Sequence, residues 1–329
     1  MQNFFLSCDW GTSFFRLRLV NVQDHRVMEE IVSKEGMAAT FSRWKEQHGQ
    51  HAISQEEYSL KILQNHIDAL GNKTKVSVTG MPVLISGMAS SSIGIRELPY
   101  ATLPFSLDGR DTSIQIIEKG ANLMHEVLLI SGISTKNDVM RGEETQMIGL
   151  TEICSVDFDE KAIWIFPGTH SKHVNVQHGK VVDFKTYMTG ELFDLIANHS
   201  ILKEAVSTAS RPMDPAGIEA FVHGISQAIG SNLLHTLFSV RVNHLFKYCT
   251  KEQNFFYLSG LLIGAELNDL QGNDLGHIQL CSGSNLFPLY QLCLEKLNLT
   301  NKASFISPEI MDRSAVGGQI KIFQQHYGR

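Results

Sequence analysis

Hydrophobic and polar positions alternate in the segment 4–20, FFLSCDWGTSFFRLRLV. In its second half, apolar Phe15, Leu17 and Leu19 alternate with Arg16 and Arg18. This is close to the period of two that a β-strand requires. The segment therefore predicts two strands, with Asp9 at the end of the first strand and a tight turn formed by Gly11, Thr12 and Ser13.

A second segment, AIWIFPGTHSKHVNV at 162–176, repeats this pattern 157 residues later. Gly168 and Thr169 fall on Gly11 and Thr12, and the apolar positions on either side also coincide. A repeat of this kind is expected if two domains share one topology. The repeat is short, so chance is the alternative. We expect each domain to offer a Gly-Thr turn to a common cleft.

The rest of the chain alternates between short apolar runs and segments with helical spacing, which predicts an α/β fold. The two domains are expected at 1–156 and 157–329, with 151–161 as a polar connection and a final helix, 315–327, near the domain interface. Segment 36–75 reads as irregular except for one helix at 54–70, and segment 93–117 as a loop or edge strand. A third strand and turn are predicted at 21–35, and further strands at 83–85, 127–133 and 303–306. Further helices are predicted at 143–150, 188–202, 216–238 and 254–270, and a strand, turn and helix at 277–297.

Composition narrows the class of protein. The 329 residues carry a net charge of −6 and contain no long Lys/Arg run, which argues against nucleic-acid binding. No run of about 18 apolar residues is present, so we expect no membrane span. The N-terminus lacks the features of a signal peptide, and the five scattered cysteines are typical of a reducing compartment. We therefore expect a cytoplasmic protein.

Gly-Thr turns suit phosphate binding. Glycine permits close approach of the backbone, and N–H and hydroxyl groups donate to phosphate oxygens. Asp9 could hold a hydrated Mg²⁺, which takes few protein carboxylates. The alternative is an ordinary hairpin with a glycine turn. Ligands also bind at the carboxyl ends of strands in open α/β sheets, which marks Ser86, Gly87 and Met88 after the strand at 83–85.

The segment NDVMRGEETQ, 137–146, gathers charged side chains where a strand gives way to a helix. A carboxylate there, Asp138 or Glu143, could accept a proton from a substrate hydroxyl. Arg141 could pair with a substrate carboxylate or a phosphoryl group. The alternative is a solvated helix start with acidic residues in its first turn.

Two segments of the second half also bear on chemistry. In GTHSKH, 168–173, Lys172 could neutralise a transferring phosphoryl group; His170 and His173 would point to opposite faces of a strand, which argues against zinc. The turn SGSNL, 282–286, could carry adenosine on Gly283 and Ser284. Gly260 and Gly264 share a helix face, which fits helix packing as well as ligand contact.

Together these segments carry a resemblance to a known family. DWGTSFFRLRLV resembles the first phosphate motif of the actin-like sugar kinase superfamily. More narrowly, the chain is similar to the 2-dehydro-3-deoxygalactonokinase family along nearly its whole length. The supporting segments are SGMASSSIG (86–94), RELPYATLP (96–104), DVMRGEETQMIG (138–149), FPGTHSKHV (166–174), FKTYMTGEL (184–192), YLSGLLIGAEL (257–267) and AVGGQI (315–320).

The resemblance implies a two-domain actin-like (ribonuclease H-like) fold with ATP in the interdomain cleft. It implies transfer of the γ-phosphate to the 6-hydroxyl of 2-dehydro-3-deoxy-D-galactonate, a step of galactonate catabolism. By motif, the phosphates and Mg²⁺ would be served by Asp9, Gly11, Thr12, Ser13, Gly168, Thr169 and Lys172, adenosine by Gly283, Ser284 and Gly260, and the acceptor by Asp138, Arg141, Glu143, Ser86, Gly87 and Met88.

Some points stay open from the sequence. Glu143 is favoured as the general base, with Asp138 second. The acceptor could instead be a gluconate-derived 2-keto-3-deoxy acid, or the chain could be a nucleotide or sugar sensor without turnover, or a phosphatase of the same superfamily. A small sugar acid is the expected partner, no nucleic acid or membrane is expected, and a homodimer is left open.

Overall fold

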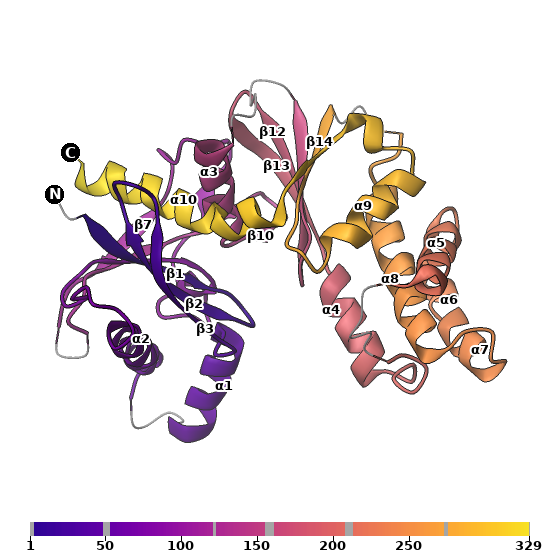
Figure 1. Ribbon diagram of the computed structural model, residues 1–329, viewed down its shortest axis with the longest axis horizontal. Coiled ribbons are helices and arrows are strands. Elements are labelled where there is room, and N and C mark those ends of the chain that lie inside the picture. Colours follow the sequence, from indigo (N-terminus) through magenta and orange to yellow (C-terminus); the bar gives the residue numbers. More distant parts are fainter. Residues whose placement is uncertain are drawn as a thin grey trace. The chain divides into compact units, whose positions relative to one another are not determined.

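The computed structural model describes residues 3–48, 53–120, 123–154, 161–207, 213–272 and 276–328. The chain divides into two units (Figure 1). The first consists of Met1–Phe158, Gly179–Asp183 and Ile310–Arg329, and the second of Asp159–His178 and Phe184–Glu309. Most of the predicted connection at 151–161 lies outside the described residues.

The first unit is built on a six-stranded sheet of order β3-β2-β1-β4-β8-β7. Strands β1, β2 and β3 are antiparallel neighbours, whereas β4 runs parallel to both β1 and β8. Their bounds are β1 Phe4–Trp10, β2 Phe15–Asn21, β3 Val27–Ser33, β4 Val83–Gly87, β7 Ile114–Ile117 and β8 Val127–Ile130. A small second sheet of order β10-β9-β5 consists of β5 Ala101–Thr102, β9 Ile133–Ser134 and β10 Val139–Met140.

Helices cover both faces of this sheet (Figure 1). The side chains of Leu6, Cys8 and Trp10 join a buried cluster with α2. Phe5 faces the other way and stacks on Phe323 of α10, with ring centroids 5.0 Å apart. Side chains of the predicted first strand therefore alternate between two buried faces, one packed against α2 and the other against α10. The helices are α1 Met37–His48, α2 Gln55–Gly71, α3 Glu143–Ile153 and α10 Pro308–Tyr327, with a 3₁₀ turn at Met88–Ser90.

The second unit repeats the strand order of the first. Its sheet runs β15-β14-β11-β12-β13, with β11 antiparallel to β12 and parallel to β14. Taken from its other edge, this sheet runs β13-β12-β11-β14-β15 and corresponds strand by strand to β3-β2-β1-β4-β8 of the first unit. This confirms the predicted common topology. The bounds are β11 Ala162–Phe166, β12 Ser171–Gln177, β13 Lys180–Tyr187, β14 His277–Cys281 and β15 Ala303–Ile306. The start of β13 pairs with β6, Phe105–Ser106, and is counted with the first unit.

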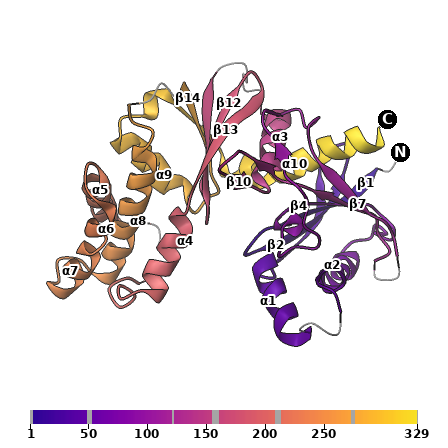
Figure 2. The ribbon, with the colours of Figure 1, turned by 180° about the vertical axis from the view of Figure 1, so that it is seen from behind.

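In the helical part of the second unit, α5, α6 and α7 gather around α8 (Figure 2). A Cβ atom at Gly260 of α8 would lie 2.1 Å from the carbonyl oxygen of Phe221 in α5, so the two backbones touch. Helix packing therefore explains Gly260. The bounds are α4 Thr189–Asp194, α5 Pro215–Ala228, α6 Leu233–Thr236, α7 Ser239–Leu245, α8 Lys251–Asn268 and α9 Phe287–Lys296, with a π-helical turn at Leu195–His199 and a 3₁₀ turn at Thr300–Lys302.

Some sequence predictions need correction. Segment 36–75 contains α1 as well as the predicted helix, whereas segment 93–117, with β5, β6 and β7 each at the edge of a sheet, agrees with the predicted loop or edge strand. Helix α1 was missed because it begins on tertiary contacts: the backbone N–H groups of Met37 and Ala38 donate to carbonyls of the turn at Gly11 and Thr12. The final helix begins at Pro308 rather than at 315.

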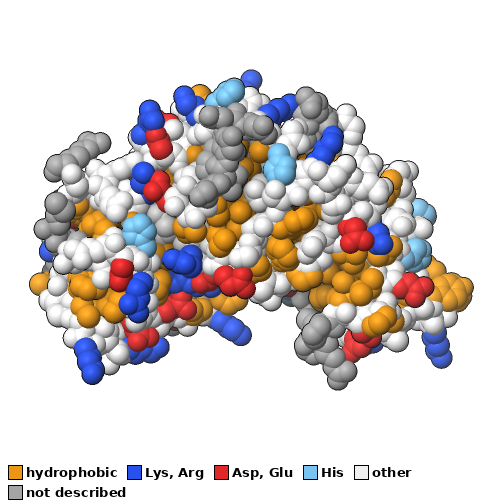
Figure 3. Space-filling view, turned by 45° about the horizontal axis from the view of Figure 1, so that its top comes forward, with side chains coloured by type: hydrophobic (Ala, Val, Ile, Leu, Met, Phe, Trp, Pro, Cys, Tyr) orange, Lys and Arg blue, Asp and Glu red, His pale blue; other side chains and the backbone are white. Residues whose placement is uncertain are grey.

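The surface differs between the two units. On the side of the first unit that Figure 3 shows, acidic and basic side chains are intermixed. Ion pairs within this unit include Arg18 with Asp312, 2.6 Å apart, and Arg96 with Glu56, 2.7 Å apart. In the second unit, large apolar side chains are exposed at and after α6 and α7, with Leu234 at 82% and Tyr248 at 71%. None of the helices in the described residues combines the length and apolarity needed to span a bilayer.

In the described part of the first unit, α3 and α10 cross so closely that the contact requires glycine on both helices. A Cβ atom at Gly149 would lie 1.7 Å from the carbonyl oxygen of Ser314. On α10, a Cβ atom at Gly318 would lie 1.9 Å from the carbonyl oxygen of Thr145. Both obstacles are backbone atoms, so neither can move without separating the helices.

We therefore expect Gly149→Ala to lower the free energy of unfolding by about 1–3 kcal/mol, because the added methyl forces the helices apart. The intrinsic helix preference of alanine, about 1 kcal/mol, acts in the opposite direction and is too small to compensate. Urea unfolding followed by circular dichroism measures the change. Gly120→Ala, where a Cβ atom meets nothing within 4 Å, is the control and should change stability by less than about 0.5 kcal/mol. Stabilisation by Gly149→Ala would contradict the packing described.

Candidate active site

The first Gly-Thr turn connects β1 to β2 and is held by backbone hydrogen bonds. The N–H of Gly11 donates to the carbonyl of Phe14 at 2.9 Å. From outside the turn, the first N–H groups of α1 donate to the carbonyls of Gly11 and Thr12 at 2.9 and 3.1 Å. A Cβ atom at Gly36 would lie 2.3 Å from the carbonyl oxygen of Thr12, so only glycine permits this approach. The turn is therefore rigid although Ser13 is exposed.

Asp9 lies near the carboxyl end of β1, opposite Ser86 of β4. The side chain is recessed but still partly accessible to solvent. Removal from water raises its pKa; Arg16 and Arg18 lower it, Glu143 raises it again, and the net pKa lies above the usual value for aspartate. A carboxylate in this state gains from a bound cation, because a cation offsets the cost of burying the charge.

Three backbone segments converge beside Asp9, and the charge of Glu143 acts on this carboxyl group. Gly87 follows β4 with φ of +91°, and a Cβ atom there would lie 2.8 Å from the carbonyl oxygen of Trp10. Gly142 has φ of +109°, and its Cβ atom would lie 3.4 Å from the Cα atom of Gly87. Helix α3 begins at the next residue, Glu143. We call the group Asp9, Gly87, Gly142 and Glu143 the Asp9–Glu143 cluster.

Glu144 fixes the start of α3. One of its carboxylate oxygens accepts from the N–H of Gly142 at 2.7 Å, and the other accepts from the hydroxyl of Thr145 at 3.0 Å. The side chain is fully enclosed, with 1% exposure. Burial, aided by the charge of Glu143, raises the pKa of Glu144 to about 7. Its ionisation is therefore coupled to the geometry of the Arg141–Gly142 peptide.

Arg141 connects to the segment that follows β4. Its guanidinium donates to the hydroxyl of Ser90 and to the carbonyl of Leu98, each at 2.8 Å, and stacks on Tyr100 with 3.9 Å to the ring centroid. Three of its five N–H groups stay available for a ligand in this geometry, including the buried Nε, which has no hydrogen-bond partner.

The structure separates the two candidate bases. Asp138 lies in the tight turn between β9 and β10, where its carboxylate accepts from the N–H of Val139 at 2.8 Å. Glu143 begins α3, and its charge acts on Asp9. Ser86 is buried beside the cluster, whereas Met88 begins the 3₁₀ turn that follows Gly87.

The second Gly-Thr turn connects β11 to β12 in the second unit. The start of α4 packs against it: a Cβ atom at Gly190 would lie 2.5 Å from the carbonyl oxygen of Gly168, and the N–H of Glu191 donates to the carbonyl of Thr169 at 3.0 Å. Lys172 is 5% exposed, and its ammonium group donates to the carbonyl of His170 at 2.8 Å. The lysine charge therefore lies directly against the turn.

The turn after β14 stands open. Gly283 and Ser284 are exposed, and a Cβ atom at Gly283 would meet nothing within 4 Å. Gly260 is different, because it is buried in the crossing of α5 and α8. The adenosine contacts predicted from sequence are therefore reduced to Gly283 and Ser284, and Gly260 serves helix packing.

The two histidines of the second turn lie in different surroundings. His170 pairs with Glu191 at the surface, whereas His173 pairs with Glu266 in the interior. In the described ranges no group of three or more His, Cys, Asp or Glu side chains could hold a metal ion. A hydrated Mg²⁺ needs only one or two protein carboxylates, so Asp9 fits that ion.

Comparisons with known proteins agree with this geometry. The family model described as 2-keto-3-deoxy-galactonokinase matches residues 9–309. The chain belongs to this family. A protein of Rhizobium meliloti (strain 1021) named probable 2-dehydro-3-deoxygalactonokinase DgoK1 is 32% identical over 314 residues, 91% of this chain and 92% of that protein. The 2-dehydro-3-deoxygalactonokinase of Escherichia coli (strain K12) is 33% identical over 226 residues, 66% of this chain and 71% of that protein.

A solved structure extends the likeness to the fold. A crystal structure from Sinorhizobium meliloti, described as a 2-dehydro-3-deoxygalactonokinase protein, is 28% identical and has a TM-score of 0.79 over 99% of this chain and 97% of that chain. Together with the strand order shared by the two units, this confirms the predicted actin-like sugar kinase fold class for this member of the 2-keto-3-deoxy-galactonokinase family.

Sequence reasoning missed several residues that shape the site of this family member. Gln319 of α10 is fully buried and donates to the carbonyl of Cys8 and to the hydroxyl of Ser86, both at 2.9 Å. Glu266 of α8 binds side chains next to the second turn. Each residue lies far along the chain from its partners. A polar residue on the apolar face of a predicted helix was the only feature of the sequence that pointed to either of them, because a buried polar group needs hydrogen-bond partners.

The raised pKa of Glu144 gives a testable pH dependence. Between pH 4.5 and about 7 the folded protein holds a proton on Glu144 that the unfolded chain has lost, so this residue makes stability fall as pH rises. Glu144→Gln removes that loss. We expect the stability of the variant relative to wild type to increase by about 3 kcal/mol between pH 4.5 and 7.5.

Thermal and urea unfolding across this pH range measure the difference. Glu152→Gln in the same helix, where the carboxylate pairs with Lys321 at 2.8 Å, is the matched control and should change stability by less than about 1 kcal/mol at each pH. A difference between Glu144→Gln and wild type that does not vary with pH would contradict the assignment.

Proposed function

We propose that the chain is an ATP-dependent kinase that transfers the γ-phosphate to the 6-hydroxyl of 2-dehydro-3-deoxy-D-galactonate. The observation that carries the proposal is the Asp9–Glu143 cluster, in which the charge of a carboxylate at a helix start acts on a second carboxylate that is suited to a cation. The names of the relatives supply the acceptor and the reaction class. Phosphoryl transfer needs mainly positioning and charge stabilisation, and both are available here.

Asp9 would hold Mg²⁺ through its water shell, and the ion would neutralise charge on the phosphates of ATP. Gly11, Thr12 and Ser13 would donate N–H and hydroxyl groups to the same phosphates. The bracing of this turn by α1 supports the role, because donors fixed in advance need no reorganisation when the phosphate binds.

Glu143 would act as the general base. It would accept the proton of the sugar acid's 6-hydroxyl as that oxygen bonds to the γ-phosphorus and the bond to the leaving ADP breaks. The tie of Glu144 to Gly142 supports this role, since it holds the preceding peptide in place. Arg141 would pair with the substrate carboxylate through its remaining N–H groups, beside Ser86, Gly87 and Met88.

In the second unit, Gly168 and Thr169 would contact a phosphate, and Lys172 would add its charge through the turn that it binds. Gly283 and Ser284 would contact adenosine, because their exposed backbone offers a flat surface. A coupled assay of ADP release tests the function as a whole. The galactonate-derived acid should support turnover more efficiently than the gluconate-derived acid, and ATP binding without transfer to either acid would contradict the proposal.

The two candidate bases can be separated by amide substitutions. We expect Glu143→Gln to lower kcat by about 10²–10⁴-fold, because it removes the proton acceptor. Asp138→Asn keeps the hydrogen bond to the N–H of Val139 and should lower kcat by less than about threefold. Steady-state kinetics with saturating ATP measures both. Equal losses in the two variants, or none in Glu143→Gln, would refute the assignment of Glu143.

The role of Asp9 predicts a metal-specific defect. Asp9→Asn should lower kcat by at least about 10²-fold and raise the Mg²⁺ concentration needed for half-maximal rate, because the amide cannot replace the charge. Titration of Mg²⁺ at fixed ATP gives both quantities. Asp108→Asn, whose carboxylate pairs with Arg110 at the surface, is the control and should show wild-type Mg²⁺ dependence. Wild-type Mg²⁺ dependence in Asp9→Asn would be inconsistent with the proposed site.

A further inference from the structure

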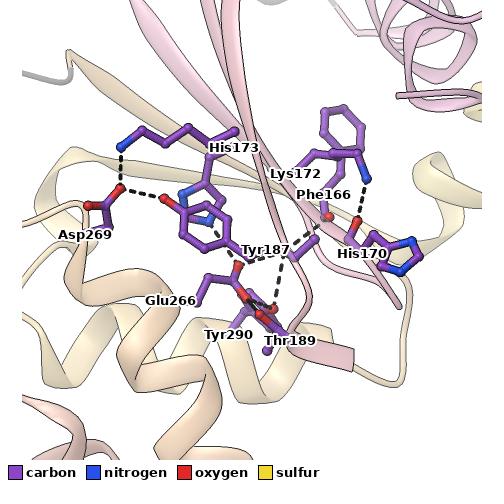
Figure 4. Close-up of polar contacts among 11 residues, drawn as sticks. Phe166, His170, Lys172, His173, Tyr187, Thr189, Glu266, Asp269 and Tyr290 are labelled. Atoms are coloured by element: carbon purple, nitrogen blue, oxygen red, sulfur yellow. Dashed lines mark hydrogen bonds and ion pairs between the residues drawn. The ribbon is translucent and has the colours of Figure 1, made fainter. Parts of the chain in front are cut away.

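A single buried carboxylate connects the elements around the second Gly-Thr turn. Glu266 of α8 has a side chain that is 1% exposed. One of its oxygens accepts from Ser171 at 2.7 Å and from the Nε2 of His173 at 2.9 Å. The other accepts from Tyr290 at 2.7 Å and from the hydroxyl of Thr189 (Figure 4). We call these five residues the Glu266 cluster.

Two donors of this cluster, Ser171 and Thr189, lie immediately beside the turn. Ser171 is the first residue of β12 and directly follows the turn at 168–170. Thr189 is the first residue of α4, the helix that packs on the other side of the turn through Gly190 and Glu191. Figure 4 shows Thr189 and His173 converging on Glu266 from different elements. Both elements that contact the turn are therefore attached to one carboxylate.

Burial of the Glu266 carboxylate is energetically unfavourable by itself. Removal from water would by itself raise the pKa of Glu266, but the hydrogen bonds from His173, Ser171 and Thr189 outweigh burial, and the pKa lies below the usual value. The group is therefore an anion that uses its hydrogen-bonding capacity on protein donors. A buried ion contributes less to stability than well-packed apolar side chains would, which points to a role in fixing geometry.

The turn is held by α4 and Lys172 rather than by packing of its own side chains. Thr169 and His170 are exposed, and a Cβ atom at Gly168 would meet nothing within 4 Å. Donors that bind a phosphate must be oriented before the ligand arrives. In the first unit, α1 supplies that order through backbone hydrogen bonds. In the second unit, α4 contacts the turn and continues into the π-helical turn Leu195–His199, and its first residue, Thr189, donates to Glu266.

We propose that Glu266 is a positioning residue for phosphoryl transfer, because it holds Ser171 and Thr189 together and so fixes the Gly168–Thr169 turn in the shape that receives a nucleotide phosphate. The inference rests on the phosphate role proposed above for this turn. Glu266 itself would not contact ATP. It acts through the two hydroxyl groups, and the loss of either hydroxyl should reproduce part of its effect.

Glu266→Gln is the first test. The amide keeps the size of the side chain but has only one oxygen, so it cannot accept from all four donors. We expect the KM for ATP to rise by about tenfold or more, or kcat to fall by a similar factor, while the KM for the sugar acid changes by less than about twofold. Circular dichroism and the melting temperature report whether the variant folds.

Thr189 gives a milder test that does not disturb the buried charge. Thr189→Val removes only the hydroxyl and should raise the KM for ATP, whereas Thr189→Ser keeps the hydroxyl and should restore the wild-type value. A merely structural role would not produce this rescue. The pair keeps the inference testable if Glu266→Gln does not fold.

Asn254 supplies a matched control for lost stability. It is buried in the same helix and donates to the carbonyls of Ala205 and Val240, each at 3.1 Å. Asn254→Ala should lower the melting temperature but leave the KM for ATP unchanged. Wild-type kinetics in Glu266→Gln or Thr189→Val, or an equal rise in the KM for ATP in Asn254→Ala, would overturn the inference.

Thr169→Ala in the turn separates this inference from the proposed function. If Thr169→Ala raises the KM for ATP and the Glu266 and Thr189 variants do not, the turn binds phosphate and only the positioning role fails. If none of these variants changes the kinetics with ATP, the phosphate role of the turn fails and the positioning role fails with it.

Discussion

The first unit depends on how closely three backbone segments approach one another at the carboxyl ends of β1 and β4. A Cβ atom at Gly87 would lie 2.8 Å from the carbonyl oxygen of Trp10, and a Cβ atom at Gly142 would lie 3.4 Å from the Cα atom of Gly87. Because both positions also have positive φ, other residues would be strained there. This approach places the start of α3, where Glu143 lies, beside the end of β4, and the charge of Glu143 acts on Asp9.

The two units hold their Gly-Thr turns in place through different contacts. Each has a Gly-Thr turn between the first two strands of an equivalent sheet. In the first unit the turn is ordered by the N–H groups of Met37 and Ala38. In the second unit the start of α4 lies against the turn, and Glu266 ties Thr189 of that helix to Ser171 of β12. A short helix needs such an attachment because isolated helices of this length are unstable in water.

Two buried glutamates show how hydrogen bonds decide the ionisation of a carboxyl group. Glu144 accepts from two donors, and burial raises its pKa to about 7. Glu266 accepts from four donors, and its pKa lies below the usual value despite burial. Glu144 therefore couples the start of α3 to pH near neutrality, whereas Glu266 stays charged and keeps its contacts over the same range.

The sequence by itself determined the strand pattern, the repeated hairpin and the helix that starts at Glu143, because these depend on local periodicity and capping. It also singled out Asp9 and Glu143 by residue type and motif. Only the tertiary structure decided that the charge of Glu143 acts on Asp9 and that Gly260 packs helices. It also decided that Gln319 binds β1 and β4 and that Glu266 binds side chains beside the second turn. These features depend on contacts between segments far apart in the chain, and such contacts leave no periodic signal along it.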